Sequence, residues 1–372
     1  MPTITEVYAL GNFIDTFALG HYARVLEAHD LRDGRQVALK IMRPEHIARD
    51  EAPRWEAKAF PHEVRLLKNL DRNPVPIRYY DCGYIQSSNE YPDGEIISLR
   101  TDWRAFEENL FPRNSEGWRP YIALEYLPRE QNLLYVMKTN NSGQRRRLPI
   151  EEGLNLAMQF GHMLLEAHEN YIFYMDHKLE HVYWDGKKLR VIDWNSSKQL
   201  EQHDAQINNL RRKDLHNLCV GILYPIFTGM SPQRGELRPQ PASQQEVDTR
   251  YNDVTHLDFS GEMLSQPIID LLERGAHQDF ANAEEFLQTV EQAAVHFGWV
   301  FRFQVTHPAL IQAREYVRNG LSKLRESAEL AREARDLLTD AAILEGINED
   351  MELELRRLMK AINDYLNMRV IP

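Results

Sequence analysis

Hydrophobic and polar residues alternate along the first part of the chain. Residues 13 to about 42 have the period of two that is typical of half-buried strands, and Asp33-Gly34 is a hairpin-turn signal between two of them. The period then becomes helical over residues 54–70. Further strands are predicted at 76–85 and 121–127. The first third of the chain therefore predicts several strands, two of them joined in a hairpin, and one long helix.

The chain that follows is dominated by helical periodicity. A polar insertion with proline and glycine precedes it at about 86–118, and a Pro/Gln/Ser-rich stretch at 230–260 predicts a long surface loop. Pro149, followed by a Glu-rich first turn, is a helix start signal. Helices are expected at about 150–169, 205–228, 262–275 and 281–296.

The last part of the chain changes composition. Pro308 opens a predicted helix to about 345, Gly346 breaks it, and a second helix runs to about 368. Hydrophobic or small residues recur every seven positions in the first helix, at Leu310, Val317, Leu324, Ala331 and Leu338. Such spacing indicates a helical hairpin or coiled coil over 306–372. Two outcomes stay open: the hairpin packs on its own domain, or it binds a protein partner or a second copy.

Composition narrows the class of protein. Of 372 residues, 43% are hydrophobic and 27% charged, which excludes a disordered or fibrous chain. The net charge of −12 leads us to expect no nucleic-acid partner, because phosphates would be repelled. The longest apolar run, 218–227, is too short for a bilayer span, and the N-terminus lacks a signal-peptide pattern. With two cysteines only, we expect a cytoplasmic protein without membrane contact.

Candidate catalytic and ligand-binding residues occur in five short segments that are spread along the sequence. They are ALGHYARVLEA at 18–28, VALK ending in Lys40, HEVRLLKNL with Glu63, YMDHKLEHVYW at 174–184 and VIDWN at 191–195. A strand–turn–strand can fold over phosphates, and a strand lysine held by an acidic residue can neutralise them. A loop aspartate can accept a hydroxyl proton, and a second aspartate can hold Mg²⁺. Their order together predicts a site for a nucleoside triphosphate.

In this order and spacing, the segments from about residue 8 to 295 resemble the protein-kinase-like superfamily. The resemblance implies an α+β, two-lobed fold with ATP bound between a small antiparallel sheet lobe and a helical lobe. The sheet lobe would be 1–127 with the insertion at 86–118, the helical lobe 128–297, and the appendage 306–372. The implied cofactors are ATP and Mg²⁺ or Mn²⁺.

The resemblance also implies roles for individual residues. Those matched to catalysis are Lys40 at the α/β-phosphates, Asp176 as the base and Lys178 at the γ-phosphate. Those matched to nucleotide binding are Gly20, Val25, Ala38, Lys40, Glu63, Glu125 and Tyr126. Asp193 matches the metal-binding aspartate, and His181 stands where an asparagine binds the second metal. Asp214 matches the aspartate that anchors the catalytic loop.

Several positions depart from the family pattern. Ala18 and Ala23 replace two glycines of the phosphate loop, and alanine restricts the backbone there. His181 is a poor ligand for Mg²⁺, which shifts the preference toward Mn²⁺ or puts the second metal in doubt. It could also share a metal with Asp193 and His177, although packing is the commoner role for such histidines. Only 21 positions separate Asp193 from Asp214, too few for a full activation segment. We therefore expect neither activation by loop phosphorylation nor the usual peptide docking surface.

Two classes of function follow. The first is an ATP-dependent phosphotransferase that acts on a hydroxyl acceptor, either protein Ser/Thr or a small molecule. The second is a catalytically impaired pseudokinase that serves as a binding scaffold through its C-terminal helices. The retained Lys40, Asp176 and Asp193 favour the enzyme. His181 and the depleted phosphate loop favour the scaffold.

Overall fold

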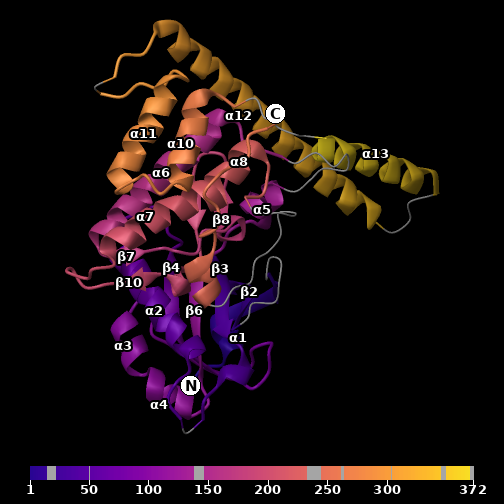
Figure 1. Cartoon of the computed structure of the whole chain (residues 1–372). Helices are drawn as coiled ribbons and strands as arrows, with labels where there is room; N and C mark the ends of the chain where they lie inside the picture. Colours follow the sequence, from indigo (N-terminus) through magenta and orange to yellow (C-terminus); the bar gives the residue numbers. More distant parts are fainter. Residues whose placement is uncertain are drawn as a thin grey trace.

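A computed structural model describes most of the chain: residues 1–14, 22–49, 51–137, 146–232, 244–260, 264–302, 304–344 and 349–368. In Figure 1 the large sheet and the helices beside it lie near the N-terminus, at the bottom of the view. The long helices lie above them. The N-terminal elements are α1 (Ile4–Val7), β1 (Tyr8–Phe13), β2 (Ala23–Asp30), β3 (Arg35–Met42), η1 (Pro44–His46), α2 (Trp55–Asn69), β4 (Tyr79–Gln86), β5 (Glu95–Ser98), α3 (Trp103–Glu108), α4 (Leu110–Ser115) and β6 (Arg119–Glu125). The predicted α+β class is confirmed.

The large sheet has the strand order β1-β2-β3-β6-β4-β5, and every neighbouring pair is antiparallel. Gly34, at φ 74°, closes the turn between β2 and β3 in a conformation that favours glycine. Both faces of the sheet are buried. Leu39 and Ile41 pack with α1 on one face, whereas Ala38 and Met42 face α2 and the helical core.

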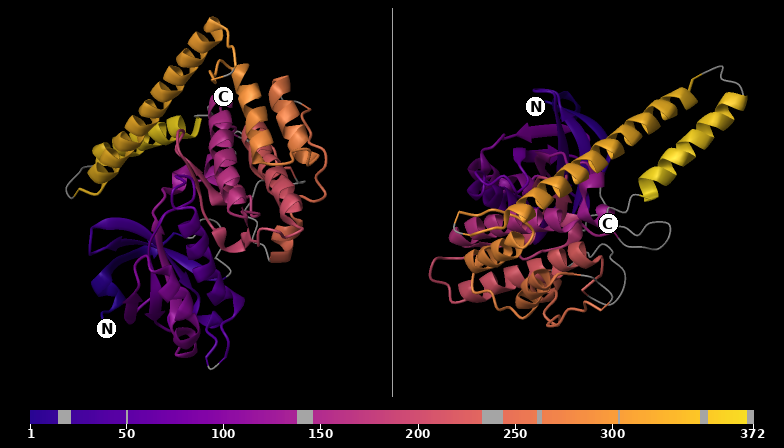
Figure 2. Two further views of the ribbon diagram at one scale, coloured as in Figure 1. Left: turned by 90° about the vertical axis from the view of Figure 1, so that its left-hand side faces the viewer. Right: turned by 90° about the horizontal axis from the view of Figure 1, so that it is seen from above.

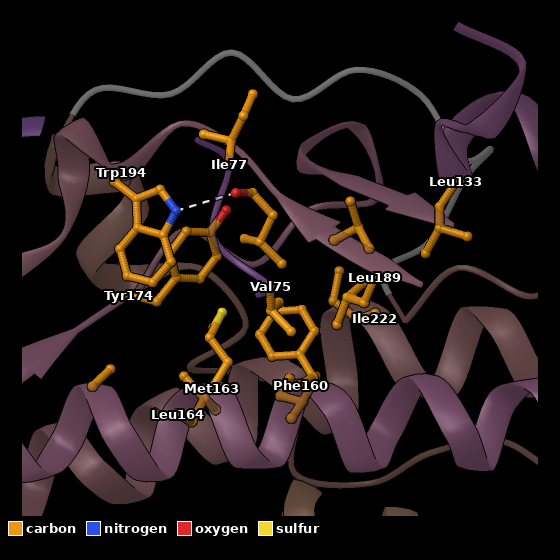
Figure 3. Close-up of a cluster of buried hydrophobic side chains, with 14 of the residues drawn as sticks. Val75, Ile77, Leu133, Phe160, Met163, Leu164, Tyr174, Leu189, Trp194 and Ile222 are labelled. Carbon is orange, nitrogen blue, oxygen red and sulfur yellow. Dashed lines mark hydrogen bonds between the residues drawn. The ribbon is translucent and has the colours of Figure 1, made fainter. Parts of the chain in front are cut away.

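The helical part is built around the 20-residue helix α6. Its elements are η2 (Arg129–Gln131), α5 (Leu133–Val136), α6 (Ile150–Glu169), β7 (Ile172–Phe173), η3 (Leu179–His181), β8 (Val182–Trp184), β9 (Leu189–Val191), η4 (Trp194–Ser196), β10 (Lys198–Gln199), α7 (Ile207–Leu218), the π-helix η5 (Cys219–Leu223), α8 (Tyr224–Thr228), α9 (Gln244–Thr249), α10 (Gln266–Ala276) and α11 (Ala283–Val295). Figure 3 shows Phe160, Met163 and Leu164 on α6 beneath the rings of Tyr174 and Trp194. This core supports the loop that carries the candidate site.

The two C-terminal helices, α12 (Pro308–Ala342) and α13 (Glu349–Met368), lie side by side and extend away from the helical core (Figure 2). The end of α12 nearest the core is docked: Arg314 forms a bidentate pair with Glu151 of α6 and lies over the Trp299 ring. Leu330 and Leu337, farther along, are 58% and 69% exposed. The hairpin therefore packs on the core over part of its length only.

The structure adds elements in one stretch without a predicted structure and corrects the prediction for another. The insertion at 86–118 contains β5, α3 and α4, and Phe106 is fully buried against Tyr84. The stretch 230–260, expected as a long surface loop, contains α9 and buries Val247 and Tyr251. The many polar residues of this stretch made the spacing of its few buried apolar residues hard to recognise in the sequence. Among the described helices, none combines the length and apolarity needed to cross a bilayer.

Candidate functional site

Lys40 is buried at the centre of an ion-pair chain that joins three elements. Its Nζ lies 2.7 Å from Glu63 Oε2 on α2 and 2.7 Å from Asp193 Oδ1, which follows β9. The second oxygen of Glu63 accepts a hydrogen bond from the backbone N–H of Trp194 at 3.2 Å. The chain thereby ties the sheet, α2 and the segment after β9 to one another.

The strand pattern explains why Lys40 points inward. Ala38 and Lys40 are two residues apart on β3 and so project from the same face, and Val25 of β2 is the register partner of Lys40. Ile122 of β6 is the partner on the other side. The structure thus places Val25 and Ala38, predicted to bind the nucleotide, on the same face of the sheet as the ammonium group.

Asp214 on α7 holds the loop that carries Asp176. Its carboxylate accepts hydrogen bonds from the backbone N–H groups of Tyr174 at 2.8 Å and Met175 at 2.7 Å. Asn217 donates to the Met175 carbonyl at 3.1 Å. Met175 has φ 66°, which is uncommon outside glycine and is maintained by these bonds. The sequence-based role of Asp214 as an anchor matches this geometry.

Asp176, His181 and Asp193 bring one candidate ligand atom each within 4.8 Å of one another. His181 Nε2 lies 3.3 Å from Asp193 Oδ2, and Nδ1 lies 3.2 Å from the Asp176 carbonyl and 3.6 Å from Asp176 Oδ2. His177 does not join this cluster; its buried ring stacks on Phe160 with centroids 5.4 Å apart. The structure therefore does not bring His177 to the candidate metal ligands.

The His181 ring suits a cation at this place. Burial lowers its pKa, and the positive charge of Lys178 lowers it further, although Asp176 and Asp193 oppose the shift. A neutral imidazole carries one N–H and one lone pair. Nε2 can donate to Asp193, while Nδ1 has the Asp176 carbonyl and, at 3.5 Å, the Tyr174 hydroxyl as neighbours, so one ring nitrogen keeps a lone pair that could bind a cation. Two carboxylates and one imidazole form a donor set that fits a divalent cation such as Mn²⁺.

Opposite charges dominate the electrostatics around Lys40. Burial lowers the pKa of Lys40, but Asp193 and Glu63 outweigh burial and raise this pKa well above its ordinary value. Burial raises the pKa of Asp193, but Lys40 and then His181 outweigh it and hold this pKa below its ordinary value. For Glu63, burial prevails over Lys40, so its pKa is raised. Lys40 and Asp193 therefore form a charged pair at neutral pH.

Asp176 has two further cationic neighbours. Lys178 Nζ lies 3.1 Å from Asp176 Oδ2, and Arg250 Nη1 lies 2.9 Å from Oδ1. Sequence reasoning identified Lys178 but missed Arg250, which comes just after α9 in the stretch expected to be a surface loop. The apolar spacing of Val247, Tyr251 and Val254 is the one signal that could have indicated a packed segment there.

Glu125, Tyr126 and Gly20, which were also matched to nucleotide binding, are not shown to join this cluster. Glu125, at the end of β6, pairs with Arg190 Nε at 3.0 Å, and Tyr126 next to it is half-buried. Gly20 lies outside the described residues. A cavity of about 280 Å³ lies beside the end of α2 and the start of β4, and none of its lining residues belongs to this site.

Comparison of the chain with protein-family models found no match, and a search of the curated proteins found none. The geometry of the site is therefore the basis for the proposals below.

Proposed function

We propose that this chain is an ATP-dependent phosphotransferase with a two-lobed, protein-kinase-like fold that acts on a hydroxyl acceptor. One observation carries the proposal: the Lys40–Glu63 pair and the Asp176–His181–Asp193 donor set meet at a single carboxylate, Asp193. A phosphate-binding cation beside a metal-binding carboxylate and a hydroxyl-orienting aspartate is the arrangement that phosphoryl transfer requires.

Each side chain of the site has a separate role in the proposed phosphoryl transfer. Lys40 binds phosphate oxygens, and Glu63 keeps its ammonium group in place. Asp176 orients the acceptor hydroxyl and accepts its proton, while Lys178 stabilises charge on the transferred group. A divalent cation held by Asp193 and His181 would neutralise charge on the phosphate oxygens. Because Asp193 Oδ2 faces His181 while Oδ1 pairs with Lys40, this carboxylate serves both neighbours at once.

A thermal-shift series on the full chain tests the proposal. We expect ATP with Mn²⁺ or Mg²⁺ to raise the unfolding midpoint, and Asp193→Ala to abolish the metal-dependent part of the shift. The exposed Asp253→Ala is the matched control and should behave as the unchanged protein does. ADP release should accompany binding. No shift at millimolar nucleotide, or equal ADP release by Asp193→Ala, would contradict the proposal.

The second candidate is a pseudokinase scaffold, and the hairpin favours it. Large apolar side chains of α12, including Tyr316, Leu330 and Leu337, are more than half exposed, and such surfaces are typical of binding sites. A protein that shows no nucleotide shift, while α12 remains folded, would support the scaffold instead of the enzyme.

A further inference from the structure

Arg250 is a buried cation that the mechanism above does not use. It follows α9 and is 8% exposed, and its Nη1 lies 2.9 Å from Oδ1 of Asp176, which is 3% exposed. The other oxygen of Asp176 faces Lys178 and His181. Arg250 therefore contacts the oxygen of Asp176 that Lys178 and His181 do not face.

The backbone around Arg250 is fixed on both sides. Before it, the buried Val247 packs with Phe173 and Met175, and Asp248 pairs with Lys198 at 2.8 Å. After it, the Tyr251 hydroxyl donates to a loop carbonyl at 3.3 Å, that of His177. These contacts tie the segment to the loop that carries Asp176. The position of Arg250 beside Asp176 is therefore determined by the packing of the residues on either side of it.

The Arg250–Asp176 contact is incomplete as a hydrogen bond. The two atoms attract each other as charges, yet neither Arg250 Nη1 nor Asp176 Oδ1 has a hydrogen-bond partner of acceptable geometry, although both are buried. Buried polar atoms are nearly always satisfied, so this pair has hydrogen-bonding capacity left that a ligand atom could use. A hydroxyl group can fill this place because its oxygen accepts a hydrogen bond while its proton is donated.

We infer that Arg250 Nη1 and Asp176 Oδ1 together bind the acceptor hydroxyl, an inference that rests on the proposed function. Arg250 donates to the acceptor oxygen, and Asp176 accepts the proton of the same group. The acceptor oxygen forms a bond to the γ-phosphorus, and the bond from this phosphorus to the β–γ bridging oxygen breaks. The electron pair leaves with ADP, and the proton passes to Asp176.

The hydrogen-bonding groups specify the class of acceptor at this point. Arg250 can donate to an oxygen and Asp176 can accept a proton from the same oxygen, and an alcohol group meets both requirements. As its oxygen loses the proton, the guanidinium group stabilises the negative charge that develops.

The test uses the full chain, ATP and Mn²⁺, with ADP release measured and water as the acceptor probe. Arg250→Met should lower kcat about 10- to 100-fold, the range for losing one hydrogen bond to a charged group. The KM for ATP and the nucleotide thermal shift should stay unchanged, and Arg250→Lys should recover part of the rate. Arg212→Met, on the exposed side of α7, is the matched control and should retain the full rate.

The outcomes separate this inference from the proposed function. If Arg250→Met keeps its nucleotide shift and releases ADP at an unchanged or higher rate, Arg250 does not bind the acceptor and the inference is wrong. If the unchanged protein shows no nucleotide shift, the proposed function fails first and the inference fails with it. Arg250→Leu, which also lacks a donor, provides the same comparison if Arg250→Met does not fold.

Discussion

Charged side chains are abundant both around Asp176 and along α12, but the two regions place them differently. Around Asp176 they are buried and paired between elements far apart in the sequence. Along the outer part of α12 they are exposed, as in the Arg335–Asp336 contact between neighbours. When one partner of a buried ion pair is removed, the other is left as an uncompensated charge in a medium of low dielectric constant. When one partner of an exposed pair is removed, water solvates the charge that remains. Substitutions should therefore be far more costly in the first region.

The largest stability effect should come from Asp214→Ala. Its carboxylate accepts two backbone hydrogen bonds and faces His168 Nε2 at 3.0 Å, so its removal leaves three buried polar groups without an acceptor. We expect a loss of about 5 kcal/mol in the free energy of unfolding, measured by urea denaturation. Asp214→Asn keeps the shape and should lose less. A loss below about 1 kcal/mol would show that water replaces the carboxylate.

The same carboxylate predicts a pH dependence. Burial raises the pKa of Asp214, but the hydrogen bond with His168 and the nearby histidines outweigh burial, so the pKa lies below its ordinary value. The stabilisation is therefore complete above the unfolded pKa of about 4 and is lost as pH falls through the lower folded value. Urea denaturation between pH 7 and pH 3 should show a smaller decline in Asp214→Asn. An equal decline would assign the acid sensitivity to other groups.

Lys40→Met should cost about 3 kcal/mol, because Glu63 is 1% exposed and would retain a buried charge without its cation. Adding Glu63→Gln should restore part of the loss, since it removes one of the two carboxylates, Glu63 and Asp193, that lose their cation. The matched control is Lys68→Met. Lys68 pairs with Asp71 at 2.6 Å, but both side chains are nearly half exposed, so we expect a change within about 0.5 kcal/mol. Equal losses in the two lysine variants would contradict the comparison.

Much of the fold could be predicted because its signals are local. The turn at Asp33-Gly34 lies between β2 and β3, and the helix expected at 150–169 is α6 with the same bounds. Pro149 marks the start of α6, and the spacing of apolar residues marks its length, so both signals lie within the helix or next to it in the sequence. The helix α9 was missed because a short amphipathic segment inside a polar stretch has too little periodicity to stand out.

The candidate site could be predicted only where its residues occur in recognisable segments. Lys40, Asp176 and Asp193 each stand in such a segment, and the structure brings their side chains together. Arg250 has no such context, since its contact with Asp176 depends on how α9 packs against the loop. The docking of α12 is equally non-local: heptad spacing predicts a helix but does not specify which arginine reaches α6.

Gly186→Ala should have an intermediate effect on the docked end of the hairpin. Gly186 has φ 92°, and an added Cβ would lie 0.8 Å from Arg325 Nη1, which donates to the Asp185 carbonyl. The strained backbone and the displaced arginine together should cost about 1–2 kcal/mol, with faster hydrogen exchange in α12. Gly320→Ala is the control: nothing lies within 4 Å of its added Cβ, so helix propensity should stabilise the protein slightly. Slower exchange in Gly186→Ala would contradict this account of docking.

The smallest effect should come from Leu337→Gln on the outer part of α12. The side chain is 69% exposed, so the free energy of unfolding should change by no more than about 0.5 kcal/mol. Leu355→Ala on α13 should cost more, because Leu355 is 5% exposed. If α12 is covered by a second copy of the chain, the unfolding midpoint will rise with protein concentration, and Leu337→Gln will remove that rise. A midpoint that does not change with protein concentration would contradict self-association through this face. The exposed side chains of α12 would then differ from the buried ones around Asp176 already in the single chain.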